Sequence, residues 1–361
     1  MKRIDKYIFF KYLSTFAFTV LVMTLIACVI DFSEKVEDFI DNSATTREIL
    51  LEYYLTFIPH INGLIFPLYA LISVIFFTSR MAFNSEVISI LGAGISFQRM
   101  LVPYIAAAGV IFGIHMLANH LVIPYGNKTR LKFENKYTDR GSNSARTDNI
   151  HLFLDPYTKV FIRHYNRIDT SMTGLRIEKI VNGELLYLLK SEKTKWLGPP
   201  NRWRFEKYET HTFRGLSESF TKISATTLDT TLNLTPQDFI RYTNQKDMIT
   251  TPELLQTIQR EKERGTGNTK IYDIEFHRRT ADAFTILILT IIGVSVAARK
   301  VRGGMGLHLA VGVGIGALFI FLSKFSVTFA TGPNMPAMLG VWIPNMLFMG
   351  VAGYLIAKAQ K

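Results

Sequence analysis

Residues 100–122 read MLVPYIAAAGVIFGIHMLANHLV, and the chain then continues as IPYGNKTRLKFENKY. The first stretch is suited to a helix that crosses a bilayer, which needs about 20 mostly apolar residues. The second stretch is mixed and polar, and this character lasts from Pro124 to Glu275. We therefore expect a membrane span to end near residue 122 and a water-exposed domain to follow it.

Five further apolar stretches surround this junction, two before it and three after the polar block. They comprise residues 8–30, 53–77, 281–298, 307–330 and 338–357. The pattern predicts an α-helical polytopic membrane protein with six transmembrane helices, arranged 3+3 around an inserted domain. The expected division is helices 1–3 in 1–126, the inserted domain in 127–249, a linker helix and the lead into helix 4 in 250–280, and helices 4–6 in 281–361.

Composition excludes several other classes of protein. Of the 361 residues, 48% are hydrophobic and only 19% are charged, and the mean hydropathy is +0.18. These values exclude a disordered chain, a collagen-like repeat and a small disulfide scaffold. The single cysteine, Cys28, cannot form an internal disulfide.

The distribution of basic residues predicts the orientation in the membrane. Basic residues gather in the N-terminus, in the loops after spans two and four, and in the C-terminal tail, whereas residues 331–337 contain none. They are Lys2, Arg3, Lys6, Lys11, Arg80, Arg99, Arg299, Lys300, Arg302, Lys358 and Lys361. The positive-inside rule then places both termini in the cytoplasm and the polar block outside. The net charge of +12 is thus explained without a nucleic-acid partner.

The polar block has the pattern of a β domain. Short segments with partial alternation of apolar and polar residues are separated by turn signals such as Asn182-Gly183. The expected strands cover 150–154, 159–165, 175–181, 185–189, 202–211 and 217–232. They favour an antiparallel sandwich, jelly roll or open barrel. Thr251-Pro252-Glu253 then predicts the start of a helix that ends at Arg264-Gly265.

No catalytic or metal-binding motif is found in the sequence. It contains no phosphate-binding loop and no HExxH or CxxC pattern, so ATP hydrolysis is expected on another chain. His115 and Asn119 share one face of the third span. We expect them to form interhelical hydrogen bonds or to line a polar cavity rather than to act in catalysis.

The loop after the second span, SRMAFNSEVISILGAGISFQR at residues 79–99, allows two interpretations. Ser85 is placed to cap a short cytoplasmic helix, with Glu86 in the first turn, where the helix dipole favours an anion. A plain capped turn explains this pattern, and so does a helix that docks into a partner with Glu86 available to a partner's Arg or Lys.

Charged residues and glycines within the spans suggest further sites. Lys324 lies inside the fifth span, where a charge is costly and therefore suggests a function, although snorkelling to the interface also explains it. Lys35 lies just beyond the first span at a similar depth, and Glu34, Glu37 and Asp38 are expected to offset its charge. Gly312 and Gly316 form a GxxxG pattern that permits close helix packing, and we expect it to bring the first and fifth spans together.

Taken together, these elements resemble the lipopolysaccharide-export permease family, LptF/LptG (YjgP/YjgQ). The resemblance covers nearly the whole chain and is carried by the loop at 84–96, by Thr251-Pro252-Glu253-Leu254, by the run from Tyr272 to Arg279, and by Pro336…Trp342-Ile343-Pro344-Asn345. It implies a permease in the bacterial inner membrane with a periplasmic jellyroll-like domain. The implied transporter extracts lipopolysaccharide from the outer leaflet and passes it on for export to the outer membrane.

The resemblance also implies partners and site residues. The partners are a cytoplasmic ATPase dimer that holds ATP and Mg, a second related permease chain, a periplasmic bridge protein with a jellyroll fold, and lipopolysaccharide itself. Residues expected to couple to the ATPase are Arg80, Asn84, Ser85, Glu86, Ile90 and Gly94. Residues expected to bind substrate are Lys35, Lys324, Phe325 and Phe329.

Two alternatives remain at this point. A lipoprotein-releasing permease, or another ABC-type scaffold with an outer domain, usually has four spans with the domain after the first, whereas here the domain follows the third. An intramembrane enzyme is the other alternative, but the sequence lacks a convergent set of acid, base or metal ligands.

Overall fold

The computed structural model separates the chain into two compact units, and each is described by itself. The helical unit comprises Met1–Asp139, Lys246–Leu254 and Lys270–Lys361, and the β unit comprises Arg140–Gln245 and Leu255–Thr269. The structure describes residues 2–138, 147–199, 201–215, 217–223, 227–239, 245–264, 269–299, 304–332 and 334–359. Gly265, Lys300, Arg302 and Lys361, which the sequence analysis names, lie outside these ranges.

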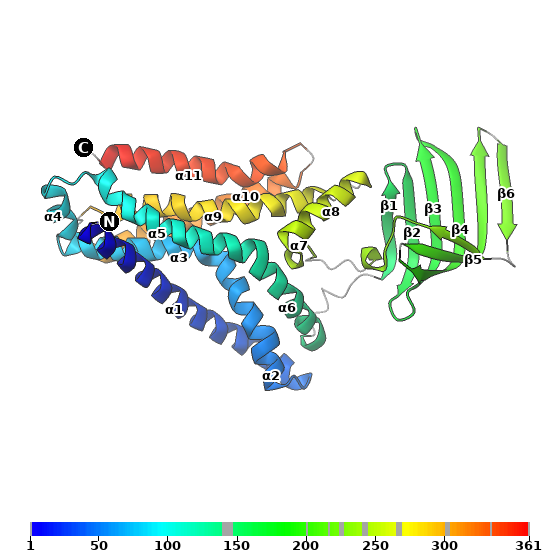
Figure 1. Cartoon of the computed structure of the whole chain (residues 1–361), viewed down its shortest axis with the longest axis horizontal. Helices are drawn as coiled ribbons and strands as arrows, with labels where there is room; N and C mark the ends of the chain where they lie inside the picture. Colours follow the sequence, from blue (N-terminus) through cyan, green and yellow to red (C-terminus); the bar gives the residue numbers. More distant parts are fainter. Residues whose placement is uncertain are drawn as a thin grey trace. The chain divides into compact units, whose positions relative to one another are not determined.

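Six helices in the described part of the chain are long and apolar enough to cross a membrane, as predicted. They are α1 (Arg3–Asp41), α3 (Leu55–Phe83), α5 (Phe97–Leu117), α9 (Thr269–Ala297), α10 (Gly304–Ala330) and α11 (Ala337–Ala359). The shorter helical elements are α2 (Thr46–Glu48), η1 (Ile49–Tyr54), α4 (Glu86–Gly92), η2 (Ala118–Val122), α6 (Ile123–Tyr137), η4 (Pro236–Phe239), α7 (Gln245–Met248) and α8 (Thr251–Glu263). Three long helices precede the β insertion and three follow it (Figure 1).

Two of these helices extend beyond the apolar stretches that predict them. The third span continues through η2 and α6 to Tyr137, past the expected boundary at residue 126. Phe133 and Tyr137 at its far end pack in an aromatic cluster with Phe39 and Tyr53. The fourth helix similarly begins at Thr269, within the polar block. Hydropathy marks where a lipid-facing surface ends, but a helix continues wherever its apolar side still packs on the same chain.

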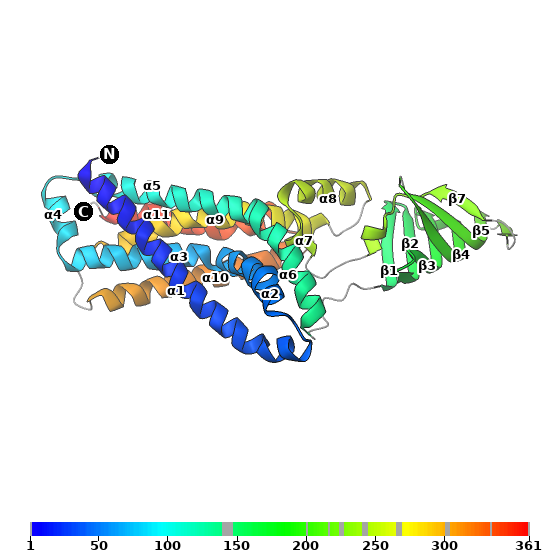
Figure 2. The same cartoon turned by 60° about the horizontal axis from the view of Figure 1, so that its bottom comes forward.

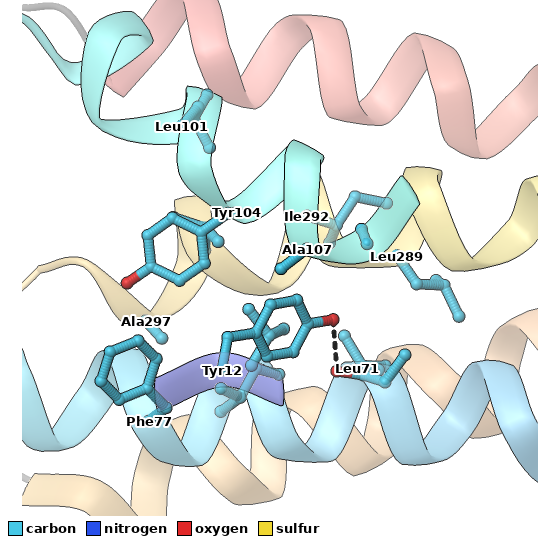
Figure 3. Close-up of a cluster of buried hydrophobic side chains, with 14 of the residues drawn as sticks. Tyr12, Leu71, Phe77, Leu101, Tyr104, Ala107, Leu289, Ile292 and Ala297 are labelled. Carbon is cyan, nitrogen blue, oxygen red and sulfur yellow. Dashed lines mark hydrogen bonds between the residues drawn. The ribbon is translucent and has the colours of Figure 1, made fainter. Parts of the chain in front are cut away.

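The core of the helical unit lies where α1, α3, α5 and α9 meet (Figure 3). Tyr12 of α1 is fully buried there. Its hydroxyl lies 2.9 Å from Oγ1 of Thr290 on α9 and donates to the carbonyl oxygen of Ala70 on α3 at 3.3 Å. A buried hydroxyl without partners is costly, so these contacts fix the relative positions of three helices.

The glycines of α10 pack against α3 and not against α1. A Cβ atom built on Gly312 would collide with Cδ1 of Ile75, and one built on Gly316 would collide with Cδ1 of Leu68. The expectation that these glycines bring the first and fifth spans together is therefore wrong within this chain. A GxxxG pattern creates a groove but does not select its partner, and the side chains of α3 fill the groove here.

A third glycine contact gives a stability prediction. Gly340→Ala is expected to destabilise the packing of α11 on α10 by about 1–3 kcal/mol, as overpacking of a filled site typically does. The new methyl group would collide with Cβ of Ala330 and lie 3.1 Å from its Cα, and neither atom can rotate away. Gly350→Ala is the matched control on the same helix, because nothing lies within 4 Å of its Cβ position. Thermal unfolding of the full chain in detergent measures both variants, and equal midpoints would contradict the prediction.

The β unit contains one antiparallel sheet of seven described strands (Figure 2). The strands are β1 (Asp148–Asp155), β2 (Thr158–Asn166), β3 (Ser171–Val181), β4 (Glu184–Gly198), β5 (Arg202–Arg214), β6 (Ser217–Ile223) and β7 (Leu228–Thr231). Strands β1 to β6 follow one another in sequence order across the sheet, and β7 also pairs with β5. The inserted antiparallel β domain is thus confirmed. Asn182 and Gly183 both have positive φ, 53° and 84°, as a two-residue type I′ turn between β3 and β4 requires.

The segment expected to form one strand at 217–232 forms two. Strand β6 pairs with residues 208–214 of β5, and β7 pairs with residues 202–205 of the same strand. Because β4 occupies the other edge of β5, β6 and β7 lie one after the other along the same edge. Alternation in the sequence does not show where a strand breaks, because both halves present the same period to the sheet.

The helix α8 begins as predicted at Thr251, and the chain after it closes the β unit. The backbone N–H of Thr250 donates to the carboxylate of Glu253 at 2.8 Å. Arg264, just beyond the helix, is buried and lies 2.9 Å from Asp238. Burial by itself would raise the pKa of Asp238, but the hydrogen bonds and the charge of Arg264 outweigh it and lower that pKa. A buried pair of this kind ties the return segment to the β unit.

Candidate functional site

The start of α1, the end of α11 and the short helix α4 lie at one end of the helical unit (Figure 1). The guanidinium of Arg299 reaches the carbonyl oxygen of Lys358 at 3.1 Å, which places the end of α9 here as well. Each segment that the positive-inside rule assigns to the cytoplasm is therefore found at the same end of the unit.

The helix α4 has one face fixed in the core and one face open. Val87 is buried and Ile90 packs against the same core cluster, whereas Ile88 and Leu91 are 53% and 38% exposed. Exposed apolar side chains on a helix of one and a half to two turns are typical of a surface that a partner covers. The helix α4 therefore carries a small exposed apolar face.

The helix starts where predicted, but Ser85 does not cap it with its side chain. Ser85 has a left-handed conformation with φ 64°, and no hydrogen bond from its side chain caps the helix. Glu86 accepts hydrogen bonds from the hydroxyl of Tyr7 at 3.3 Å and from the amide of Asn84 at 3.4 Å. Arg80 is exposed in the last turn of α3. Gly94 is also exposed, and its positive φ of 80° ends the segment after α4. Of the six expected coupling residues, Arg80, Asn84 and Gly94 are thus exposed and Ser85 and Glu86 are half-buried, whereas Ile90 packs against the core.

Lys35 is buried in an ionic network and is not directed to lipid. Its ammonium lies 2.9 Å from Asp31 and 3.3 Å from Glu134, and it also donates to the hydroxyl of Tyr53. Arg130 pairs with Glu134 at 2.8 Å, so the two cations are balanced by two carboxylates. Only 9% of Lys35 is exposed.

The expected neighbours of Lys35 are thus not its partners. Glu34 and Glu37 are exposed. The partners are instead Asp31, one turn before on α1, and Glu134, which α6 brings from a distant part of the chain. Spacing on one helix could suggest the first partner, but only tertiary packing places the second.

Lys324 lies at a cavity of about 110 Å³ in the helical unit. Arg278 and Asp282 of α9 line the same cavity and pair with each other at 3.0 Å. The remaining walls are mostly apolar and include Leu64, Pro67, Leu68, Gly316, Phe319 and Ile320. Lys324 itself is exposed and forms no ion pair within the described ranges.

The two phenylalanines expected near Lys324 lie on the outer face of α10. Phe325 and Phe329 are 53% and 57% exposed, and their rings meet edge to face at 4.8 Å. Phe321 stacks on Phe325 and extends the row by one turn. The row offers a continuous aromatic surface beside the cation.

A second, more polar cavity of about 90 Å³ lies beside Asn119, and the charged residues of α9 at its wall were not predicted from the sequence. Glu275 and Arg279 of α9 lie at its wall and are almost fully buried. Arg279 donates to Glu275 at 2.9 Å and to the backbone carbonyls of Lys246 and Ile249 at 3.0 and 2.9 Å. It therefore holds the segment 246–251 against the helices. Charges just before an apolar stretch are usually read as interfacial, and this is why the sequence did not indicate their burial.

Asn119 also lines this cavity, and it bonds to His115 on the same helix face. His115 and Asn119 bond to each other at 3.0 Å, and Asn119 also donates to the carbonyl oxygen of Arg279 at 3.4 Å. Asn119 lines the cavity and bonds to α9, so both proposed roles are confirmed for this residue. The hydrogen bond of His115 is instead to Asn119 on the same span. Asp247 is also at the wall, and burial followed by the charge of Glu275 raises its pKa. Within the described ranges no cluster of acidic, histidine or cysteine side chains could hold a metal ion.

Comparison with known protein families decides the identity of this arrangement. The family model "Lipopolysaccharide export system permease LptF/LptG" matches residues 6–358. The chain belongs to this family. Among curated proteins no match to the chain is found. Three membrane helices, a β insertion and three further helices are thus the LptF/LptG arrangement, and the chain is a membrane-transport subunit of the lipopolysaccharide export type.

Proposed function

We propose that this chain is a permease subunit of an ABC transporter that extracts lipopolysaccharide from the outer leaflet of the inner membrane. It then passes the glycolipid to a periplasmic bridge for export to the outer membrane. The LptF/LptG match over residues 6–358 carries this proposal. The basic residues at one end of the helical unit support cytoplasmic termini and a periplasmic β unit.

An ATPase dimer is the proposed partner at the end that carries α4. The sequence has no phosphate-binding loop of its own, so ATP and Mg would be held by that partner. The exposed side chains of Ile88 and Leu91 would enter its groove, and Glu86 would meet a basic residue there.

A second related permease chain is the proposed partner within the membrane. The most apolar window of α1 is only 6% buried inside this chain, against 67% for α9. The cavity at Lys324 has about 110 Å³, whereas even small-molecule sites typically need about 300–1,000 Å³. A glycolipid with several acyl chains therefore needs walls from a second chain, with Lys324, Phe325 and Phe329 on the side supplied here.

The β unit is proposed to connect to the bridge protein through its sheet. Strand β1 pairs only with β2 among the described strands, which leaves its other edge able to accept a strand from a partner. An edge-to-edge junction would continue the sheet from one protein into the next.

Reconstitution tests the proposal. The full chain is co-expressed with an ATPase, a second permease and a bridge protein that carries a photo-crosslinker, and ATP-dependent crosslinking of lipopolysaccharide to the bridge is measured in vesicles. We expect crosslinks with ATP and only background without it. Failure of the chain to co-purify with an ATPase, or transfer that does not depend on ATP, would contradict the proposal.

A further inference from the structure

The start of α1 is tied by two polar contacts to the first residue of α4 and to the first turn of α5. A guanidinium nitrogen of Arg99 lies 2.7 Å from Oδ2 of Asp5, and the hydroxyl of Tyr7 donates to the carboxylate of Glu86 at 3.3 Å. Arg99 follows α4 along the chain and Glu86 begins it. The start of α1 therefore holds both ends of this segment.

Asp5 is the more constrained of these groups. It is only 8% exposed, and its Oδ2 also accepts the backbone N–H of Lys2 at 2.9 Å. Its partner Arg99 lies in the first turn of α5, where its own backbone N–H donates to Oγ of Ser96. One carboxylate thus joins the starts of two helices, and a charge-assisted bond of 2.7 Å is among the stronger contacts a side chain can make.

The remainder of α1 is anchored mainly near its two ends. Ile8, Tyr12 and Phe16 are buried close to the start, and the Lys35 network holds the far end. Between residues 17 and 30 no side chain is fully buried, but Val20 and Met23 pack partly buried against the core, and Thr24 makes a hydrogen bond to α3 at 3.0 Å. At 1.5 Å per residue, the helix measures about 58 Å and extends well beyond the hydrocarbon core of a bilayer.

We propose that Asp5 and Arg99 are positioning residues that make α1 a mechanical link between the α4 segment and the Lys35 network. Displacement of α4 and of the start of α5 by the ATPase moves the first turn of α1 through the Asp5–Arg99 pair. Tyr12 binds this part of α1 to α3 and α9, so the helix moves together with them and disturbs the network that joins Lys35 to Glu134 of α6. This inference rests on the proposed function, because glycolipid transfer is the activity that the link would drive. The link itself rests on the contacts described above.

The first test compares variants in the assembled transporter. Arg99→Gln removes the charge, Arg99→Lys retains it, and Asp5→Asn preserves an acceptor for the N–H of Lys2 while losing the ion pair. We expect glycolipid transferred per ATP hydrolysed to fall at least tenfold for Arg99→Gln and Asp5→Asn, and less for Arg99→Lys. The double variant should lose no more than either single variant, because both remove the same contact. Arg3→Gln is the control, since Arg3 is exposed in the same turn and makes no ion pair in the described part of the chain.

A second test measures the link directly and does not require transport. Nitroxide labels are placed at Phe10 on α1 and Ile88 on α4, both exposed, in a Cys28→Ala background of the full chain. We expect one narrow distance distribution in the parent and a broadened one in Arg99→Gln. In the first test, by contrast, a role of Asp5 and Arg99 in membrane insertion alone would leave the amount of glycolipid transferred per ATP hydrolysed unchanged.

The two proposals fail in different ways. If the parent complex transfers no glycolipid, the proposed function fails, and the label distances still decide whether the link exists. If Arg99→Gln keeps both the parental transfer per ATP and the parental distance distribution, the inference is overturned.

Discussion

Glu86→Lys is expected to abolish recovery of the ATPase in pull-downs of this chain, while the chain remains inserted in the membrane. The reversed charge would face a basic residue of the partner, and losing one member of a desolvated charge pair typically costs about 2–5 kcal/mol. Glu86→Ala should weaken recovery more than tenfold for the same reason. The residue is in the first turn of α4, outside the membrane core of the chain, so insertion should not change.

A matched control separates the partner contact from the intrachain bond. Tyr7→Phe removes the hydroxyl that donates to Glu86 but leaves the carboxylate in place. We expect near-normal ATPase recovery with Tyr7→Phe. Normal recovery of the ATPase with Glu86→Lys would contradict the assignment of α4 as the docking helix.

Lys324→Ala should produce the largest loss of glycolipid binding among single substitutions in the membrane helices. Its ammonium is exposed beside a mostly apolar cavity and has no carboxylate partner of its own in the described ranges. A contact between an ammonium and a phosphate in such a site is stronger than a surface ion pair. Lys324→Arg should retain much of the binding, because charge matters more than shape for a flexible cation.

Binding is measured on purified complexes at low and high salt, with Lys35→Ala as the contrasting variant. Lys35 is already paired, so its loss removes a buried cation that Asp31 and Glu134 share. Glu134 then keeps only Arg130, and Asp31 keeps only hydrogen bonds from tyrosine hydroxyl groups. We therefore expect Lys35→Ala to lower the stability of the chain more than Lys324→Ala does. It should lower the glycolipid affinity per folded molecule less than Lys324→Ala does. Equal glycolipid binding by the parent and by Lys324→Ala would contradict the prediction, and would mean that Lys324 only extends its charge to the membrane interface.

The features predicted well from the sequence are those that depend on neighbouring residues along the chain. Six apolar stretches predicted six helices, the alternating segments predicted an antiparallel β insertion, and Asn182-Gly183 predicted a turn. The position of α4 after Ser85 was also predictable, because helix starts have local signals. Even here the detail differs, since the side chain of Ser85 does not cap the helix.

The candidate site could be predicted only in part. The six expected coupling residues are close in sequence, but the structure turns Ile90 toward the core and leaves Arg80, Asn84 and Gly94 exposed. Lys324 was found because a charge stands out within an apolar span. Glu275 and Arg279 were missed, because charges that precede a span normally face water, and their burial depends on the segment 246–251 that Arg279 holds.

By itself the sequence determined the membrane class, the 3+3 order of spans around a β insertion, and the residues of the α4 loop. The hydropathy and the periodicity of a segment depend only on residues that are close in sequence, so a helix or strand can be predicted from them without any distant residue. Only the tertiary structure decided that α3 fills the glycine groove of α10, and that Glu134 from α6 neutralises Lys35. In both cases a local pattern supplies a groove or a charge, and its partner is whichever distant side chain the packing of the helices brings within reach.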